Sequence, residues 1–196
     1  MGCAIYRVRR FIPLGREKPL VSQRVEPIAV THGIDVADFT CIMDALALLK
    51  RDHDEVRLLF KKFKSAENER QSVTQAIAAA LHAHSHIEES LFYPILEEQK
   101  DQQLIAIVDN SLKEHQEMKS LLKDILGLIQ DGPQLASRVM KLEGHVEHHF
   151  TEEEDGMFPL VRQAVESREL ERIGEALEVE KRNYLAGGIH ITSGAG

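Results

Sequence analysis

The eleven residues His84-Ser-His-Ile-Glu-Glu-Ser-Leu-Phe-Tyr-Pro94 recur later in the chain as His149-Phe-Thr-Glu-Glu-Glu-Asp-Gly-Met-Phe-Pro159. In each copy a histidine is followed by a glutamate at the fourth position and by a proline at the tenth. A four-residue step places two side chains on the same face of an α-helix. Each copy therefore predicts a helix on which an imidazole and a carboxylate converge. Iron, manganese and zinc accept such nitrogen and oxygen ligands, so the repeat predicts a metal site.

From residue 44 onward, apolar residues recur at alternating steps of three and four, which is typical of helices in a bundle. The pattern predicts an all-α fold with four long helices, near residues 44–65, 70–98, 101–129 and 133–164. Short connections between them indicate an antiparallel up-down-up-down four-helix bundle. A shorter amphipathic helix near 167–184, with Leu170, Ile173 and Leu177 on its apolar face, is expected to pack across one end. Because proline cannot continue helical hydrogen bonding, Pro94 and Pro159 are expected to end or kink their helices.

The same spacing predicts which side chains face the core of the bundle. Helix by helix, they are Leu46, Leu49, His53, Val56, Phe60 and Phe63; Ile77, Leu81, His84, Glu88, Leu91 and Ile95; Leu104, Val108, Ser111, His115, Met118, Leu122 and Ile125; and Leu135, Val139, Leu142, Val146, His149, Glu153 and Leu160.

Each of the four predicted core faces carries one histidine near its middle, and the second and fourth add a glutamate. Counting from the turns at about 1.5 Å per residue puts the four imidazoles within roughly one helical turn of a common level. Glu88 and Glu153 then lie one turn away on diagonally opposed helices. This approximate two-fold symmetry favours two metal ions with the glutamates spanning them. A metal-free network of hydrogen-bonded side chains remains an alternative, although unpaired buried polar groups cost several kcal/mol each, on the order of 2–7.

The pattern of His53, His84-x-x-x-Glu88, His115 and His149-x-x-x-Glu153 resembles the hemerythrin-like (HHE cation-binding) family over about residues 43–165. The resemblance implies a non-haem di-iron centre with an oxo or hydroxo bridge, and zinc or manganese remain alternatives. The ligands it implies are four terminal histidines and two bridging glutamates: His53, His84, His115, His149, Glu88 and Glu153.

The chain departs from the oxygen-carrying branch of that family. Those carriers have a fifth histidine one turn along the third helix, where this chain has Lys119, and an aspartate in place of Glu153. Fewer protein ligands imply open coordination positions, where a small molecule binds. His145 lies at the level of Lys119, so both are candidates for an additional ligand or for a contact behind the ligands. Glu89 and Glu154, each next to a predicted ligand, are expected to make contacts of that kind or to face solvent.

Composition limits the setting of this metal site. The net charge of −8 argues against nucleic acid as a partner, and no apolar run reaches the length of about 20 residues that a membrane helix requires. The two cysteines, Cys3 and Cys41, fall outside the predicted bundle, which favours a reducing cytoplasm. We expect an irregular or disordered extension over 1–42, the bundle over 43–165, and a short helix with a flexible tail over 166–196. Whether translation begins at Met43 stays open.

Three hypotheses for function remain. The first is a protein whose di-iron site binds or senses O₂, NO or peroxide, or holds labile iron. The second is an enzyme-like role in peroxide removal or in iron delivery for iron–sulfur cluster repair. The third is a structural zinc or apo bundle. No catalytic residue can be named beyond the metal ligands, which favours the first hypothesis and leaves enzymatic activity open. A sensor without its own output domain would need a protein partner.

Overall fold

The computed structural model describes residues 43–128 and 132–187, and the predicted extension over 1–42 and the tail from residue 188 lie outside them. Within the described part of the chain the regular structure is helical, with no strand, as the sequence predicts. None of the helices in these ranges combines the length and apolar character needed to cross a membrane.

The helices follow the predicted order, with two interruptions. The elements are α1 (Ala45–Ser65), a 3₁₀ turn (Glu67–Glu69), α2 (Arg70–Ile87), the π-helical segment η3 (Glu88–Phe92), α3 (Tyr93–Glu98), α4 (Gln102–Gly127), α5 (Gly132–Thr151), the π-helical segment η4 (Glu152–Met157), α6 (Phe158–Ala164) and α7 (Ser167–Ala186). The predicted second helix is therefore α2, η3 and α3 in continuous succession, and the fourth is α5, η4 and α6.

Local sequence explains where α1 and α4 begin. The Asp44 carboxylate accepts a hydrogen bond of 2.8 Å from the backbone N–H of Ala47. Asp101 accepts one of 2.8 Å from the N–H of Gln103 at the start of α4. These caps satisfy N–H groups that have no partner within the helix. Just before Asp101, Lys100 adopts a φ of 57°, a left-handed conformation that ends the preceding helix and reverses the chain.

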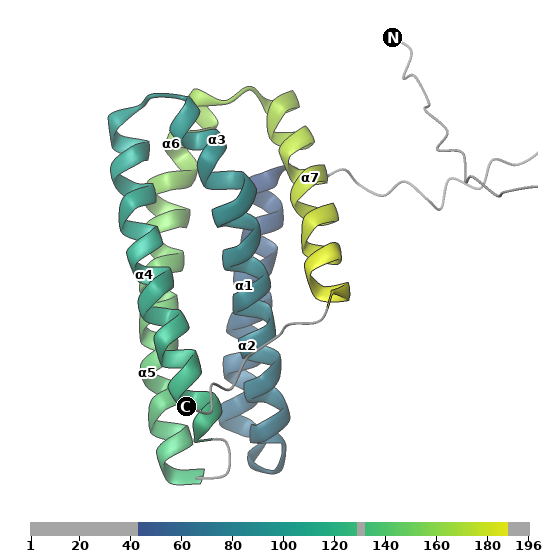
Figure 1. The fold of residues 1–196 in the computed structure, drawn as a ribbon, viewed down its shortest axis with the longest axis vertical. Helices are drawn as coiled ribbons and strands as arrows, with labels where there is room; N and C mark the ends of the chain where they lie inside the picture. The colour runs from purple at the N-terminus through teal and green to yellow at the C-terminus, as the bar shows by residue number, and fades with distance from the viewer. Residues whose placement is uncertain (1–42, 129–131, 188–196) are drawn as a thin grey trace, which may run out of the picture. The chain divides into compact units, whose positions relative to one another are not determined.

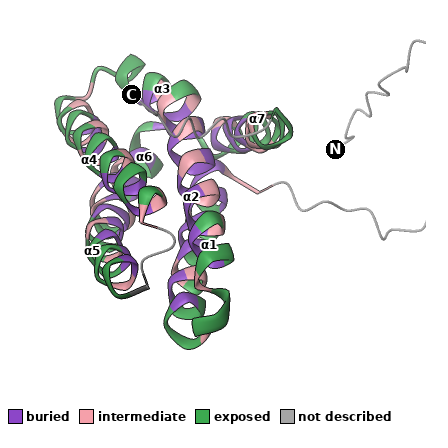
Figure 2. Cartoon of the chain, turned by 60° about the horizontal axis from the view of Figure 1, so that its bottom comes forward, coloured by how far each residue is buried: buried purple, intermediate pink, exposed green. Residues whose placement is uncertain are grey.

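Two helical hairpins form the bundle. α1 packs against α2, α4 packs against α5, and α2 with α3 contacts α4, which agrees with the predicted up-down arrangement (Figure 1). Buried residues line the inner faces of the helices (Figure 2). They form two apolar clusters, one around Leu49, Phe92 and Val161 and the other around Phe60 and Phe150. The predicted metal-binding side chains lie between these clusters along the chain, so a polar layer interrupts the core.

The sequence predicts that the two prolines end or kink their helices, and neither proline ends its helix. Each follows a π-helical segment, and the chain then continues as α3 or α6 with the proline in its first turn. Proline has no N–H to donate and crowds the carbonyl four residues earlier. The wider π turn immediately before each proline accommodates this, because its hydrogen bonds span five residues instead of four.

The π segments also shift the buried face by one residue, which corrects part of the predicted core. Leu91, Ile95 and Leu160 were expected to face the core but are only partly buried. The fully buried positions are instead the next ones along the chain, Phe92, Leu96 and Val161. A pattern of period 3.6 cannot anticipate this shift, because the extra residue of a π turn rotates every later side chain around the helix.

The helix α7 lies alongside α1 and α2 rather than across one end of the bundle (Figure 1). Its apolar positions Leu170, Ile173 and Leu177 are buried, as the sequence predicts. Gly174 allows the close approach, because a Cβ atom there would collide with the backbone carbonyl oxygen of Met43. Absence of a side chain at this one position therefore sets how closely α7 packs on the start of α1.

Candidate metal centre

Four buried histidines bring one ring nitrogen each to the same level of the bundle. The Nε2 atoms of His53 in α1 and His84 in α2 are 3.2 Å apart. Those of His115 in α4 and His149 in α5 are 3.0 Å apart. None of the four side chains is more than 2% exposed. The predicted convergence of the imidazoles is therefore present in the fold.

Glu88 lies between the two histidine pairs. Its Oε1 is 3.3 Å from Nε2 of His84, and its Oε2 is 3.4 Å from Nε2 of His115. The side chain is fully buried, and neither oxygen has a hydrogen-bond partner. A buried carboxylate that is left unpaired is costly, so the two oxygens are available for cations. One carboxylate facing both histidine pairs is the arrangement that a bridging ligand requires.

Glu153 is oriented differently. Its Oε2 is 3.2 Å from Nε2 of His53 and 3.7 Å from Nε2 of His149. Its Oε1 accepts a hydrogen bond of 2.7 Å from the hydroxyl of Tyr93. Glu153 thus directs one oxygen into the pocket while Tyr93 holds the other.

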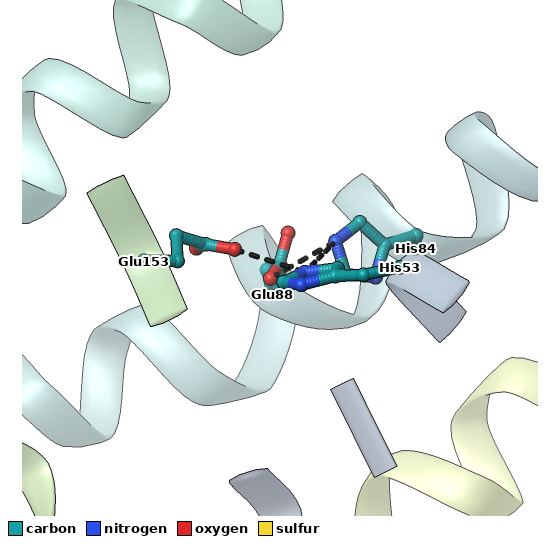
Figure 3. Close-up of side chains that lie close together, drawn as sticks. All are labelled: His53, His84, Glu88 and Glu153. Atoms are coloured by element: carbon teal, nitrogen blue, oxygen red, sulfur yellow. Dashed lines mark hydrogen bonds and ion pairs between the residues drawn. The ribbon is translucent and has the colours of Figure 1, made fainter. Parts of the chain in front are cut away.

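These six side chains form two groups with the geometry to hold a metal ion. In the first, ligand atoms of His53, His84, Glu88 and Glu153 all lie within 4.8 Å of one another, and Figure 3 shows these side chains pointing toward a shared space. The second group consists of Glu88, His115 and His149. Glu88 belongs to both. The donor set and the unpartnered oxygens of Glu88 and Glu153 fit two cations that share a carboxylate.

The two further candidates lie outside the pocket. The His145 side chain is 39% exposed, and its Nδ1 is 3.6 Å from Oε2 of Glu117. Lys119 donates to both oxygens of Glu89, at 2.6 and 2.7 Å. His145 therefore makes no contact with the six converging side chains, whereas Lys119 acts on them through Glu89.

Carboxylates behind the histidines orient the rings, and two of them were expected from the sequence. Nδ1 of His53 is 2.8 Å from Oε1 of Glu154, and Nδ1 of His115 is 2.7 Å from Oε1 of Glu89. Each glutamate follows a buried glutamate in one copy of the repeat and reaches the histidine of a different helix. A carboxylate at Nδ1 places the proton on that nitrogen, so the lone pair of Nε2 faces the pocket.

The other two carboxylates were not identified from the sequence. Glu114 accepts from Nδ1 of His149 at 2.9 Å, and Oδ2 of Asp52 lies 3.9 Å from Nδ1 of His84. The shorter side chain of aspartate leaves the second distance beyond hydrogen-bond range. The sequence does contain a pattern that could have identified them, because each acidic residue directly precedes a predicted ligand, in Asp52-His53 and in Glu114-His115. We refer to Asp52, Glu89, Glu114 and Glu154 as the outer carboxylates.

Basic side chains balance most of the outer carboxylates. Lys181 of α7 lies 2.8 Å from Asp52, and Arg57 donates to Glu154 at 2.7 Å. Burial opposes ionisation at these positions, but the neighbouring imidazoles and cations lower the pKa of Asp52, Glu89 and Glu154 to about 2 each. These three carboxylates are therefore ionised at neutral pH, the state in which Glu89 and Glu154 accept a hydrogen bond from an Nδ1–H group.

Inside the pocket the two glutamates titrate in opposite directions. Burial and the nearby charge of Glu153 raise the pKa of Glu88 well above its ordinary value. Burial opposes the charge of Glu153, but the imidazoles of His149 and His53 lower its pKa. In His53, contacts with Glu153 and Glu154 outweigh burial and raise the pKa to about 9. The metal-free pocket therefore holds protons that a cation would displace on binding.

Two aromatic residues that were not singled out from the sequence fix the rings from the side. Phe150 stacks on His53 with ring centroids 3.8 Å apart and an interplanar angle of 13°. Tyr93 is fully buried, and burial together with the charge of Glu153 raises its pKa well above the ordinary value. Its hydroxyl therefore remains protonated and acts as a hydrogen-bond donor to Glu153.

Comparisons with known proteins agree with this geometry. The profile of the hemerythrin HHE cation binding domain matches residues 44–161. A protein of Nostoc sp. (strain PCC 7120 / SAG 25.82 / UTEX 2576) named "DNA nickase" is 29% identical over 151 residues, which is 74% of this chain and 40% of that protein. The chain thus spans less than half the length of this relative. No solved structure matches the chain. With the profile covering more than half of its residues, the chain belongs to the hemerythrin HHE cation-binding family.

Proposed function

We propose that the chain holds two iron ions in the pocket and uses them to bind or sense O₂, NO or peroxide, or to hold labile iron. The ligands in this proposal are the four histidines with Glu88 and Glu153. The observation that carries it is Glu88, whose two buried oxygens have no hydrogen-bond partner and face different histidine pairs. Burial raises the pKa of Glu88, so the buried group favours its neutral form without cations, and two cations in the pocket would compensate its charge when it is ionised.

Iron bound by these residues would supply redox chemistry and open coordination positions for a small ligand. The chain's own residues make the pocket dry and fix its donors. The six side chains are at most 2% exposed, and the outer carboxylates hold three of the four imidazoles by hydrogen bonds of 2.7 to 2.9 Å. Imidazole and carboxylate donors also suit zinc and manganese, so the identity of the metal as iron is itself part of the proposal.

Binding or sensing is favoured over an enzyme-like role because the described residues offer no acid, base or nucleophile at the pocket beyond the ligands and the groups that orient them. Peroxide removal, iron delivery for cluster repair, and a structural zinc or apo bundle are the competing functions. The cytoplasmic setting and a separate protein partner for any signalling output belong to the proposal as well.

The Nostoc relative suggests a second candidate function, which is cleavage of one strand of DNA. The matched region spans 40% of that protein, so the remaining 60% has no counterpart in the match. The net charge of −8 also disfavours binding to a polyanion. We therefore place DNA nicking second and include it in the test.

The test is anaerobic loading of the metal-free protein with Fe(II), followed by metal analysis and optical spectra with O₂, NO and H₂O₂. We expect about two iron ions per chain and a stable spectral change with at least one of the three ligands. Glu88→Gln, which keeps the size of the side chain but removes its charge, is expected to lose the dinuclear spectrum. Repeated turnover of peroxide would favour the enzyme-like role, and nicking of supercoiled plasmid by the loaded protein would favour the second candidate. If the protein binds zinc and shows no iron spectrum, the structural zinc bundle is the function that this test supports.

A further inference from the structure

The two halves of the pocket are related by the internal repeat but differ at one aromatic position. Aligning His84 with His149 pairs Glu88 with Glu153 and pairs Tyr93 with Phe158. The two rings occupy equivalent places. Tyr93 stacks on His115 with centroids 5.7 Å apart, and Phe158 stacks on His53 with centroids 5.9 Å apart. The repeat therefore preserves the ring and changes only the hydroxyl.

That hydroxyl changes the role of one carboxylate. Tyr93 donates to Oε1 of Glu153 at 2.7 Å, whereas neither oxygen of the equivalent carboxylate Glu88 has a hydrogen-bond partner. Phe158, the counterpart of Tyr93, has no hydroxyl to donate. A hydrogen bond to an ionised oxygen is stronger than one between neutral groups. It therefore competes with a cation for Oε1.

A second pair of positions differs in the same direction. Ser111, four residues before His115, is buried, and its hydroxyl is among the groups that act on the pKa of Tyr93. The position four residues before His53 is Leu49, which is also buried but apolar. One half of the pocket is thus polar at two positions where the other half is apolar.

We infer that the Tyr93 hydroxyl makes the two metal positions unequal by reserving one oxygen of Glu153. This rests on the proposed two-metal centre and adds which position is filled first. The first position has four protein donors, from His53, His84, Glu88 and Glu153. The second has three, from Glu88, His115 and His149.

Fewer protein donors mean weaker binding and more open coordination, so the ion beside His115 and His149 is the labile one. The two ions then bind in separate steps, the first tightly and the second weakly. Tyr93 is a positioning residue in this account, because it acts on the metals through Glu153. Tyr93→Phe keeps the ring and its stacking on His115 and removes only the donor, which frees Oε1 of Glu153.

Loss of a group that orients a metal ligand usually weakens metal binding, by about 10- to 100-fold. Tyr93→Phe is expected to change the affinity of the second step by the lower end of that range, about tenfold, but in the opposite direction. The second step becomes tighter because the removed hydroxyl competes with the metal. If Tyr93 only stabilised the pocket, its replacement by phenylalanine would weaken the second binding step.

The test is an anaerobic titration of the metal-free full chain with Co²⁺. Binding is measured by calorimetry and by the visible absorption of the bound ion. We expect two separable steps in the natural protein, and a tighter second step with the same total of two ions in Tyr93→Phe. Tyr184→Phe is the matched control, because Tyr184 stacks on His86 away from the pocket and its hydroxyl contacts neither glutamate. It should leave both steps unchanged.

A single step of two equivalent ions in the natural protein would overturn the inference while leaving the metal centre intact. An unchanged or weaker second step in Tyr93→Phe would overturn it as well. Failure of Co²⁺ to bind at all would overturn both the inference and the proposed centre. Reactivity with O₂, NO or peroxide does not enter this test, so its loss would affect only the proposed function.

Discussion

Nδ1 of His53 and Oε1 of Glu154 lie 2.8 Å apart although the two residues are 101 positions apart in the chain. The contact joins α1 to η4 and fixes the imidazole so that Nε2 faces the pocket. Arg57 donates to the same Glu154 oxygen at 2.7 Å, and its guanidinium carbon lies 5.4 Å from the centre of the Phe150 ring, which itself stacks on His53. One histidine is thus held by a carboxylate, a cation and an aromatic ring together.

Glu154→Gln should weaken metal binding by about 10- to 100-fold, the usual cost of losing a carboxylate behind a metal-bound histidine. The amide keeps the size of the side chain but loses the negative charge that holds the proton on Nδ1. Calorimetric titration with Zn²⁺ measures the change. Asp155→Asn is the matched control, since it makes the same change of charge one residue later, at an exposed position. Equal affinities of the two variants would contradict the role of Glu154.

Glu88→Gln should abolish the stabilisation of the fold by metal. A ligand that binds only the folded state at 1,000 times its dissociation constant stabilises it by about 4 kcal/mol. Because Glu88 faces both histidine pairs, its loss removes a donor from each metal position. Differential scanning calorimetry with and without Zn²⁺ should show a large upward shift of Tm in the natural protein and in the control Glu98→Gln, and little in Glu88→Gln. A shift of normal size in Glu88→Gln would exclude this residue as a ligand.

Acidification should release the metal. Ligating imidazoles must be neutral, so protons compete with cations for the ring nitrogens as the pH falls. The loaded protein is desalted at a series of pH values from about 7.5 to about 4, and its metal content is measured. We expect full content at the upper end and progressive loss toward the lower end. Full retention at about pH 4 would be incompatible with a site built on four histidines.

Gly174→Ala should destabilise the fold by about 1–3 kcal/mol, the usual range for overpacking. The added Cβ would collide with the backbone carbonyl oxygen of Met43, which cannot move without shifting the start of α1. Gly144→Ala is the opposite control. It lies inside α5 with nothing within 4 Å of the added atom, and alanine favours a helix interior over glycine by about 1 kcal/mol. Thermal unfolding should therefore move in opposite directions in the two variants, and a loss of stability in both would contradict the packing of α7.

Much of the fold followed from local regularities. The spacing of apolar residues predicted α1 and α4 within a residue or two, because a helix is stabilised by contacts three and four positions apart. It also placed Leu170, Ile173 and Leu177 on the buried face of α7. The residues after Glu88 and Glu153 were assigned to the wrong face, since the π turns before Pro94 and Pro159 break that period.

The convergence of the six donors could also be anticipated, because it depends on helix geometry and on equal counts from the turns. Two of the four outer carboxylates could be predicted from the sequence. Glu89 and Glu154 lie in the repeat itself, whereas Asp52 and Glu114 each sit one position before a histidine, off the face that the periodicity predicts to be buried.

The amino-acid pattern alone implies that two similar hairpins each bring histidines and a glutamate to a shared level, since a four-residue step aligns side chains whatever surrounds the helix. The packing of the helices against one another sets the difference between the two glutamates: Glu88 faces both histidine pairs, whereas one oxygen of Glu153 accepts a hydrogen bond from Tyr93. That difference depends on distances between helices that are far apart in the chain. No local pattern encodes such distances, because they are fixed by how all the side chains pack together.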